Sequence, residues 1–147
     1  MLKARDAGLP PPAALYLNTP VLDLTHSSDS LSTNLGVDVV LGSGVKGVAD
    51  LYRNGADPTH PYLSPLFGDL GRGFPPTYLR TGTRDLLLSD TVRMHAALRK
   101  AGVEADLYVG EAMPHGGFAI LGVETQEDYN AREDLARWLS PRWIAPD

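Results

Sequence analysis

The chain has 147 residues, about the size of one ordinary domain. Its composition, 43% apolar and 21% charged, is typical of a folded soluble protein and excludes intrinsic disorder. The net charge of −5, with 13 Lys and Arg residues that do not cluster, argues against a nucleic-acid partner. The absence of Cys excludes disulfides, thiolate metal sites and cysteine nucleophiles.

The given sequence predicts neither a membrane-spanning segment nor an export signal. No apolar run reaches the roughly 18 residues that a spanning helix needs. The start, Met1-Leu-Lys-Ala-Arg-Asp, lacks the apolar stretch of a signal peptide. We therefore expect a soluble, cytoplasmic protein that does not contact a membrane.

Elements of the first half are short and separated by Pro and Gly. Residues 1–7 resemble the end of a helix that stops at Gly8. Residues 13–18 are almost wholly apolar, which predicts a strand buried on both faces of a parallel sheet. Residues 25–34 read as a polar loop, and residues 45–52 as a short helix with one apolar side.

The second half alternates strands with helices. Residues 77–81 have the aromatic and β-branched content of a strand. Residues 103–109 alternate apolar with polar side chains, which predicts a strand near a sheet edge with one face in water. Between these strands, a helix that Gly102 can terminate is indicated by an apolar stripe: Leu87, Thr91, Met94, Leu98 and Ala101.

A capping box of Thr125 and Asp128 begins a final helix, and Ser140-Pro141 ends it. Its apolar side carries Ala131, Leu135, Trp138 and Leu139. Strands that alternate with helices predict an α/β fold with a parallel sheet, right-handed crossovers and helices on the sheet faces.

Two chemically capable side chains follow neighbouring predicted strands. Asp85 lies in Gly82-Thr-Arg-Asp85, after the second strand, and His115 lies in Met113-Pro-His115-Gly-Gly-Phe118, after the third. Reactive groups of parallel sheets gather just beyond the carboxyl ends of the strands. An acid followed by a histidine in this order is how an α/β hydrolase presents two members of its catalytic triad.

Each of these residues also has an ordinary structural interpretation. An Asp after a strand is most often a turn or helix-capping residue, and a His beside glycines is most often a loop residue; only their pairing favours catalysis. We interpret His26, His60 and His95 as structural. No spacing suggests a metal site, and the acidic pairs at 127–128 and 133–134 are most simply the solvated face of the last helix.

These two motifs are similar to the carboxyl-terminal half of the hormone-sensitive-lipase-like esterases, an α/β-hydrolase family also called fold-3 hydrolases. The supporting stretches are Asn18-Thr-Pro-Val-Leu-Asp-Leu-Thr25, Asp57-Pro-Thr-His-Pro-Tyr-Leu-Ser-Pro-Leu66 and Phe74-Pro-Pro76, and the similarity runs from Met1 to about Trp138. The resemblance implies a hydrolase of small esters or lactones that uses no cofactor. It also implies that Asp85 is the triad acid and His115 the triad base.

Two motifs of the family are missing from this chain: the Gly-x-Ser-x-Gly nucleophile elbow and the His-Gly-Gly run that forms the oxyanion hole. Leu41-Gly-Ser43-Gly is no substitute, since it lacks the first Gly and a strand-turn-helix context. No nucleophile is therefore assigned, and we expect the isolated chain to lack esterase activity. Loss of a triad nucleophile costs about six powers of ten in turnover.

We consider the chain to be the carboxyl-terminal half of one hydrolase domain over residues 1–147, with residues 27–72 as an insert that covers the substrate. The strand at 13–18 has no partner for its outer edge, so an amino-terminal half or a second copy is expected to pair there. A non-catalytic interaction or ligand-binding module derived from a hydrolase remains an alternative. A dienelactone-hydrolase-like or prolyl-peptidase-like protein is less favoured, because Asp85-Leu-Leu-Leu-Ser lacks the typical Asp-x-x-Val-Pro.

Overall fold

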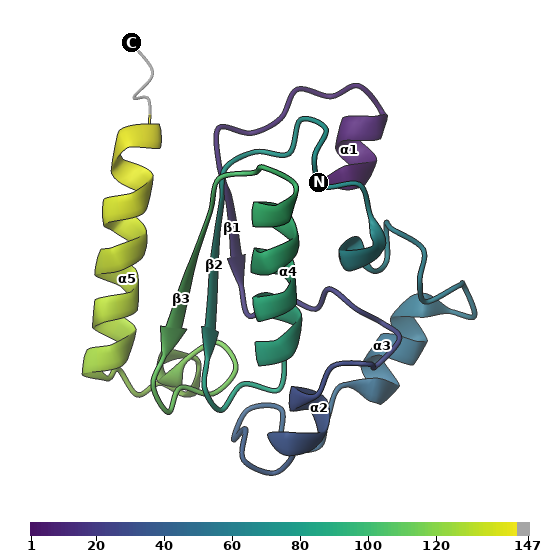
Figure 1. Ribbon diagram of the computed structural model, residues 1–147. Helices are drawn as coiled ribbons and strands as arrows, with labels where there is room; N and C mark the ends of the chain where they lie inside the picture. Colours follow the sequence, from purple (N-terminus) through teal and green to yellow (C-terminus); the bar gives the residue numbers. More distant parts are fainter. Residues whose placement is uncertain (144–147) are drawn as a thin grey trace.

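The computed structural model describes residues 1–143, which form one parallel sheet of three strands in the order β1-β2-β3 (Figure 1). The strands are β1 (Leu15–Asn18), β2 (Thr77–Gly82) and β3 (Ala105–Gly110). In register, Leu15 lies opposite Thr77, and Gly82 lies opposite Gly110. The predicted parallel α/β fold is thus confirmed, and β3 is an edge strand as expected.

Two long helices cover opposite faces of the sheet, and shorter ones lie beyond β1 (Figure 1). The long helices are α4 (Leu88–Lys100) and α5 (Gln126–Leu139). The short helices are α1 (Leu2–Asp6), α2 (Ser30–Thr33) and α3 (Lys46–Arg53), with single turns of 3₁₀ helix at Pro65–Phe67, Phe118–Leu121 and Ser140–Arg142. Within the described residues, no helix is long and apolar enough to cross a membrane.

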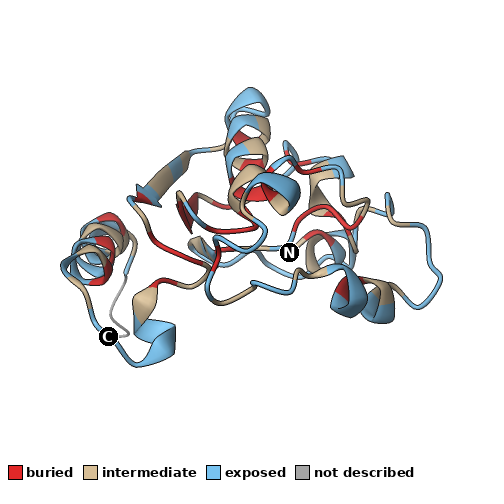
Figure 2. Ribbon diagram, turned by 90° about the horizontal axis from the view of Figure 1, so that it is seen from below, coloured by how far each residue is buried: buried red, intermediate tan, exposed pale blue. Residues whose placement is uncertain are grey.

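Helix α4 packs its predicted apolar stripe onto one sheet face. Its Met94 and Leu98 join Leu79 of β2 in a cluster of buried side chains, which Leu2 of α1 also enters. All of β2 is buried, whereas β1 and β3 are mostly half-buried or exposed, and Figure 2 shows further burial on the inner sides of the helices. Ala101 departs from the prediction, because it is the exposed capping residue at the end of the helix.

Gly102 ends α4 in the manner that the sequence predicted. Its φ is +77°, a left-handed conformation that glycine adopts without a steric penalty. The Gly102 N–H donates to Arg99 O, and the Val103 N–H donates to Leu98 O. These two bonds make a Schellman motif, which satisfies the last carbonyls of the helix and turns the chain into β3.

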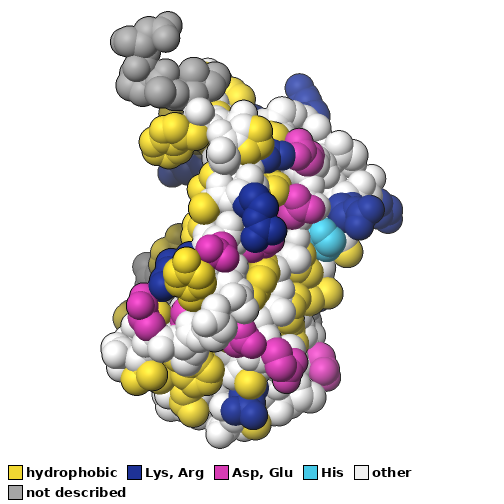
Figure 3. All heavy atoms as spheres, turned by 90° about the vertical axis from the view of Figure 1, so that its left-hand side faces the viewer, with side chains coloured by type: hydrophobic (Ala, Val, Ile, Leu, Met, Phe, Trp, Pro, Cys, Tyr) yellow, Lys and Arg dark blue, Asp and Glu magenta, His cyan; other side chains and the backbone are white. Residues whose placement is uncertain are grey.

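Helix α5 packs on the other sheet face through Tyr78. The Tyr78 ring lies 5.5 Å from the ring of Trp138, and its hydroxyl donates to Asp134 at 2.6 Å. Burial, followed by the bond to Asp134, raises the pKa of Tyr78 far above its usual value. Figure 3 shows acidic and basic side chains interspersed over this side of the molecule.

Strand β1 is less buried than the sequence predicted. Only β2 pairs with it, and the side chains along it alternate between half-buried and exposed, with Tyr16 38% exposed. Leu17 packs against the cluster under α4, whereas α5 covers β2 and β3 on the opposite face. The expectation of burial on both faces was wrong for this chain, because no described element covers the face of β1 that carries Tyr16.

The segment between β1 and β2 also differs from expectation in two places. The supposed polar loop contains the short helix α2, and Ser28 and Ser30 in it are buried. The predicted helix is present as α3, but only Ala49 of its apolar side is buried. Val48 is 74% exposed, so this side of α3 faces an open pocket rather than a closed core.

Candidate active site

The loops that follow β2 and β3 meet at the carboxyl-terminal edge of the sheet. After β2 the chain turns at Thr83 and Arg84 and reaches Asp85, three residues before the start of α4. After β3 a turn leads to His115. The two strands are parallel neighbours, so their ends bring these residues together. Oδ1 of Asp85 lies 3.2 Å from Nδ1 of His115.

Asp85 is fully buried, and protein donors satisfy its carboxylate. Its Oδ2 accepts from the Thr81 hydroxyl at 2.7 Å. Its Oδ1 accepts from the Leu87 N–H at 2.9 Å and also faces the imidazole. A buried carboxylate with this many donors is held in one orientation. Asp85 can therefore act as a fixed acceptor for a proton on Nδ1 of His115.

His115 is in contact with both the protein interior and the surface, since its side chain is 22% exposed. A carboxylate beside Nδ1 favours the tautomer with its proton on that nitrogen. The other nitrogen, Nε2, then carries the lone pair. Such a ring can accept a proton from a hydroxyl group, and the carboxylate stabilises the imidazolium that results.

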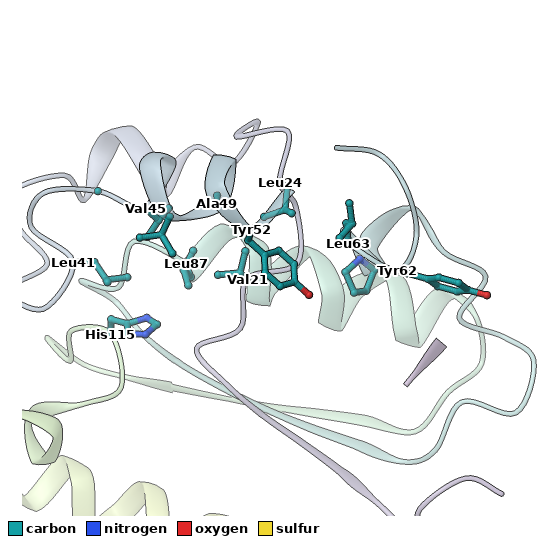
Figure 4. A pocket seen from close by; sticks show the side chains of 13 residues that line it. Val21, Leu24, Leu41, Val45, Ala49, Tyr52, Tyr62, Leu63, Leu87 and His115 are labelled. Carbon is teal, nitrogen blue, oxygen red and sulfur yellow. The ribbon is translucent and has the colours of Figure 1, made fainter. Parts of the chain in front are cut away.

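His115 lines an apolar pocket of about 540 Å³. In the view of Figure 4, the labelled side chains form a row with His115 near one end and Tyr62 at the other. Much of the lining comes from the segment between β1 and β2, including Leu24, Val45 and Ala49. A pocket of this size, with one histidine and two tyrosines among apolar side chains, is typical of sites for small organic ligands.

Glycine at position 82 lets the His115 loop pack directly on the end of β2. A Cβ atom at Gly82 would lie 1.9 Å from the carbonyl oxygen of Met113 and 2.7 Å from its Cβ. The same carbonyl accepts from the Arg84 N–H at 3.1 Å, which ties the two loops together. The spacing between Asp85 and His115 thus depends on a close backbone contact.

We expect Gly82→Ala to destabilise the protein by about 1–3 kcal/mol or more, because the clash is with backbone that cannot rotate away. Urea unfolding measures the loss. Gly47→Ala is the matched control, since nothing lies within 4 Å of a Cβ at this position in α3. The control should gain up to about 1 kcal/mol from helix propensity. Equal stability of the two variants would contradict the role given to Gly82.

A buried ion pair supports the His115 loop from beneath. Nη2 of Arg80 lies 3.2 Å from Oδ1 of Asp128, and both side chains are largely buried. A Cβ at Gly117 would collide with this pair, lying 2.3 Å from Asp128 Oδ1 and 2.7 Å from Arg80 Nη2. The loop containing His115 therefore passes directly over the ion pair.

The interpretation of residues 127–128 and 133–134 as a solvated acidic face was wrong at Asp128, which is buried and pairs with Arg80. Asp134 keeps a side chain that is 42% exposed, although it also accepts from the Tyr78 hydroxyl. The capping box itself is confirmed, with Thr125 and Asp128 bonded reciprocally. Arg80 is the one charged residue of β2, and this pattern in the sequence could have indicated a buried acidic partner. The sequence does not show which acid that partner is.

Two further carboxylates fasten the segment after β1 to α4. Asp90 of α4 is buried and accepts from the Leu22 N–H at 2.8 Å, from the Asp23 N–H at 3.0 Å and from the Ser28 hydroxyl. Its burial raises its pKa above the ordinary value. Asp90 thus fixes the start of the segment that lines the pocket.

Asp23, in the segment after β1, forms an ion pair with α4: its Oδ2 lies 2.8 Å from Nη1 of Arg93. Burial alone would raise the pKa of Asp23, but bonds from Ser27, Thr25 and Arg93 outweigh it and lower the pKa to about 2. The stabilisation from this lowered pKa is present above pH 4 and is lost as the pH falls toward about 2.

His60, His95 and Ser43 do not belong to the Asp85–His115 pair, as their surroundings show. Nε2 of His95 lies 3.2 Å from Ala105 O, and the Tyr62 N–H donates to Nδ1 of exposed His60. Ser43 is exposed in a loop that precedes α3, without a preceding strand. Within residues 1–143, no group of three or more potential ligands could hold a metal ion.

Comparison with known proteins places this arrangement in a family. A family model described as alpha/beta hydrolase fold matches residues 1–119. An esterase of Acinetobacter venetianus is 36% identical over 131 residues, which are 88% of this chain and 43% of the relative. An acetyl-hydrolase of Streptomyces hygroscopicus is 36% identical over 99 residues, 67% of this chain and 33% of the relative.

Solved structures agree with this assignment. The esterase E25 is 44% identical with a TM-score of 0.84, over 93% of this chain and 42% of its own. A hormone-sensitive lipase from a metagenome library is 32% identical with a TM-score of 0.88, over 97% of this chain and 49% of its own. The chain belongs to the α/β-hydrolase fold family, and the resemblance to hormone-sensitive-lipase-like esterases is confirmed. It spans less than half the length of each of these relatives.

Proposed function

We propose that this chain supplies the acid, Asp85, and the base, His115, of a carboxylic ester hydrolase of the serine type. The observation that carries the proposal is the 3.2 Å contact between the two side chains, at the strand ends and beside an apolar pocket. The similarity to esterases and to an acetyl-hydrolase supports esters as the substrate class. Small acyl esters or lactones would fit the pocket.

In this mechanism a serine hydroxyl from outside the chain donates its proton to Nε2 of His115 while its oxygen attacks the carbonyl carbon of the ester. Asp85 stays ionised and stabilises the imidazolium. The imidazolium then donates the proton to the leaving alkoxide as the tetrahedral intermediate collapses to an acyl-enzyme. Water, activated by the same imidazole, releases the acid and restores the serine.

The sequence 1–147 contains neither a nucleophile elbow nor an upstream His-Gly-Gly run. A serine, together with donors for the oxyanion, would come from an amino-terminal half of the hydrolase. Loss of a triad nucleophile lowers turnover by about six powers of ten, and the oxyanion donors normally provide the residual catalysis. The isolated chain is therefore expected to be inactive.

The test compares the isolated chain with a chimera, in which this chain replaces the matching segment of the Acinetobacter venetianus esterase. The isolated chain should not hydrolyse p-nitrophenyl acetate or butyrate above the buffer rate, whereas the chimera should. Hydrolysis by the isolated chain that His115→Ala abolishes would contradict the missing-nucleophile argument. A folded but inactive chimera would contradict the catalytic proposal and favour the alternative, a non-catalytic interaction or ligand-binding module.

Residues 27–72 would act as part of a cap over the substrate. They contribute most of the apolar lining that faces His115, and they include the exposed apolar side of α3. Carboxylates at Asp90 and Asp23 hold the start of this segment on α4. A cap of this kind excludes water from the reacting ester and places its apolar part beside the catalytic pair.

The partner that completes the hydrolase would dock along β1. The Leu15 N–H donates to Pro76 O, just before β2, and the Thr19 N–H donates to Arg80 O of β2. Alternate residues of a parallel strand bond to opposite sides. The backbone groups of Tyr16 and Asn18 therefore face the open edge. The uncovered sheet face that carries Tyr16 adjoins this open edge. An amino-terminal half or a second copy could add a strand to the edge and cover that face.

We expect the isolated chain to self-associate at high concentration through this edge. Tyr16→Pro should abolish the association, because it removes an outward N–H without removing a bond to β2. Tyr16→Ala, which keeps that N–H, is the matched control. Light scattering measures the mass. A strictly monomeric chain at high concentration, with cooperative unfolding, would contradict edge pairing between copies.

A further inference from the structure

Asp38, in the segment between β1 and β2, is a fully buried carboxylate with four backbone donors. Its Oδ1 accepts from the N–H groups of Val40 at 2.9 Å and Leu41 at 3.2 Å, which fixes its own turn. The other two donors belong to the loops of the candidate active site. A charged side chain this deeply buried is costly unless donors compensate it, and these donors come from three separate parts of the chain.

The two remaining contacts connect Asp38 to both halves of the Asp85–His115 pair. Its Oδ2 accepts from the Leu86 N–H at 2.9 Å, and Leu86 directly follows Asp85. Its Oδ1 lies 3.4 Å from the backbone nitrogen of His115, the longest of the four contacts. One carboxylate thus joins the loop after β2 to the loop after β3, although Asp38 belongs to neither.

Neighbouring side chains of the same segment reinforce this connection. The side-chain amide of Asn34 donates to Thr83 O at 3.2 Å and to Asp85 O at 2.8 Å. The Ser30 hydroxyl donates to Leu86 O at 2.7 Å. The loop that carries Asp85 is therefore hydrogen-bonded to residues 30–38. Of these residues, Asp38 also accepts a hydrogen bond from the loop that carries His115.

We infer that Asp38 is a positioning residue for the Asp85–His115 pair, a role that rests on the proposed function. It does not touch the reacting atoms. It sets the separation of the two loops, on which the contact between Asp85 Oδ1 and His115 Nδ1 depends. Misplacement of a catalytic group by about 1 Å can cost about 100-fold in rate, so a bond that fixes two loops affects catalysis directly.

The first measurement is nitrogen NMR of ¹⁵N-histidine-labelled chain, at about pH 8, above the ordinary titration range of histidine. In the native protein, the His115 ring should show one tautomer, with its proton on Nδ1. In Asp38→Ala the ring should instead show averaged tautomers and faster exchange of that proton. A folded Asp38→Ala protein with an unchanged His115 ring spectrum would overturn the inference, because a merely structural residue would alter stability alone.

Asp38→Asn is the milder variant and decides the question if Asp38→Ala does not fold. An amide offers one acceptor oxygen, so its NH₂ group must face either the Leu86 N–H or the N–H groups of Val40 and Leu41. At least one connection is lost while the volume is kept. We expect an intermediate change in the tautomer signal, and an unchanged signal in this folded variant would also count against the inference.

Asp90→Asn is the matched control, because it removes a buried carboxylate that also binds backbone amides but contacts neither loop of the pair. Its amide oxygen can accept from the Leu22 and Asp23 N–H groups while its NH₂ donates to the Ser28 hydroxyl. The His115 signal should stay native. A change as large as that of Asp38→Ala would show that any buried charge in this region has the same effect, and would overturn the inference.

In the chimera, Asp38→Ala should lower kcat by about 100-fold with KM changed by less than about threefold. Arg137→Met, a substitution of an exposed residue on α5 that lines neither loop of the pair, should leave both near the parent values. A large rise in KM with unchanged kcat would assign Asp38 to substrate binding instead and contradict the inference. If the parent chimera is inactive but the His115 signal still depends on Asp38, the proposed function fails and the positioning of the pair stands.

Discussion

In the chimera, His115→Ala is expected to lower kcat by about six powers of ten. The reason is that His115 is the histidine among the described residues that line the pocket, and the Asp85 carboxylate lies behind its ring. KM should change little, since the apolar lining stays intact. Initial rates at saturating p-nitrophenyl butyrate, divided by the enzyme concentration, give the size of the loss in kcat.

Asp85→Asn in the same chimera should lower kcat by about four powers of ten. An amide nitrogen beside Nδ1 favours the wrong tautomer of His115, although the geometry stays almost unchanged. His95→Gln is the control, because the Gln amide can still donate to Ala105 O and the residue lies on α4 away from the pocket lining. If His115→Ala or Asp85→Asn cost less than about tenfold, these residues would not be the triad base and acid.

Arg80→Met is expected to lower the free energy of unfolding by about 3–5 kcal/mol. The substitution leaves the Asp128 carboxylate, whose side chain is 1% exposed, without its cation beneath the His115 loop. Arg137→Met is the matched control, because Arg137 is 74% exposed and lies 3.9 Å from Asp134. An exposed pair of this kind contributes about 0.5 kcal/mol or less. Similar losses for the two variants would contradict a dominant role of the buried pair.

The effect of Arg80→Met should depend on pH. Burial alone would raise the pKa of Asp128, but bonds from Thr125, the Ala119 N–H and Arg80 outweigh it, so the net pKa is lowered. A lowered pKa of an acid means that its stabilisation is present above its unfolded pKa, near 4, and is lost as the pH falls through the folded value. The stability difference between native protein and variant should therefore shrink below about pH 4. A constant difference would indicate that Asp128 does not titrate with the ion pair.

Local sequence patterns predicted the long elements of the fold well. The stripe through Leu87, Met94 and Leu98 gave α4, and the capping box at Thr125 gave α5. Both predictions depend on contacts between residues three or four apart, which the sequence displays directly. The burial of β1 was predicted less well, because a strand's burial depends on elements distant in sequence or outside the described chain.

The candidate site was also partly predictable. Asp85 and His115 were identified from their place after neighbouring strands, and the structure brings them to 3.2 Å. Arg80, Asp128 and Asp38 were missed as supports of the site, because the bonds that give them this role join residues 48 to 77 positions apart, as for Arg80 with Asp128 and Asp38 with His115. No local pattern marks a buried carboxylate whose donors are backbone amides of another loop.

The sequence by itself therefore determined the alternation of strands and helices, the family resemblance, and the presence of an acid and a histidine without a recognisable nucleophile elbow. Only the tertiary structure decided how these two residues are held. Residues 30–38 cross to the loop of Asp85, Asp38 reaches both loops, and the Arg80–Asp128 pair lies under the loop of His115. The physical reason is that hydrogen bonds and ion pairs act over about 3 Å in space, whatever the separation along the chain.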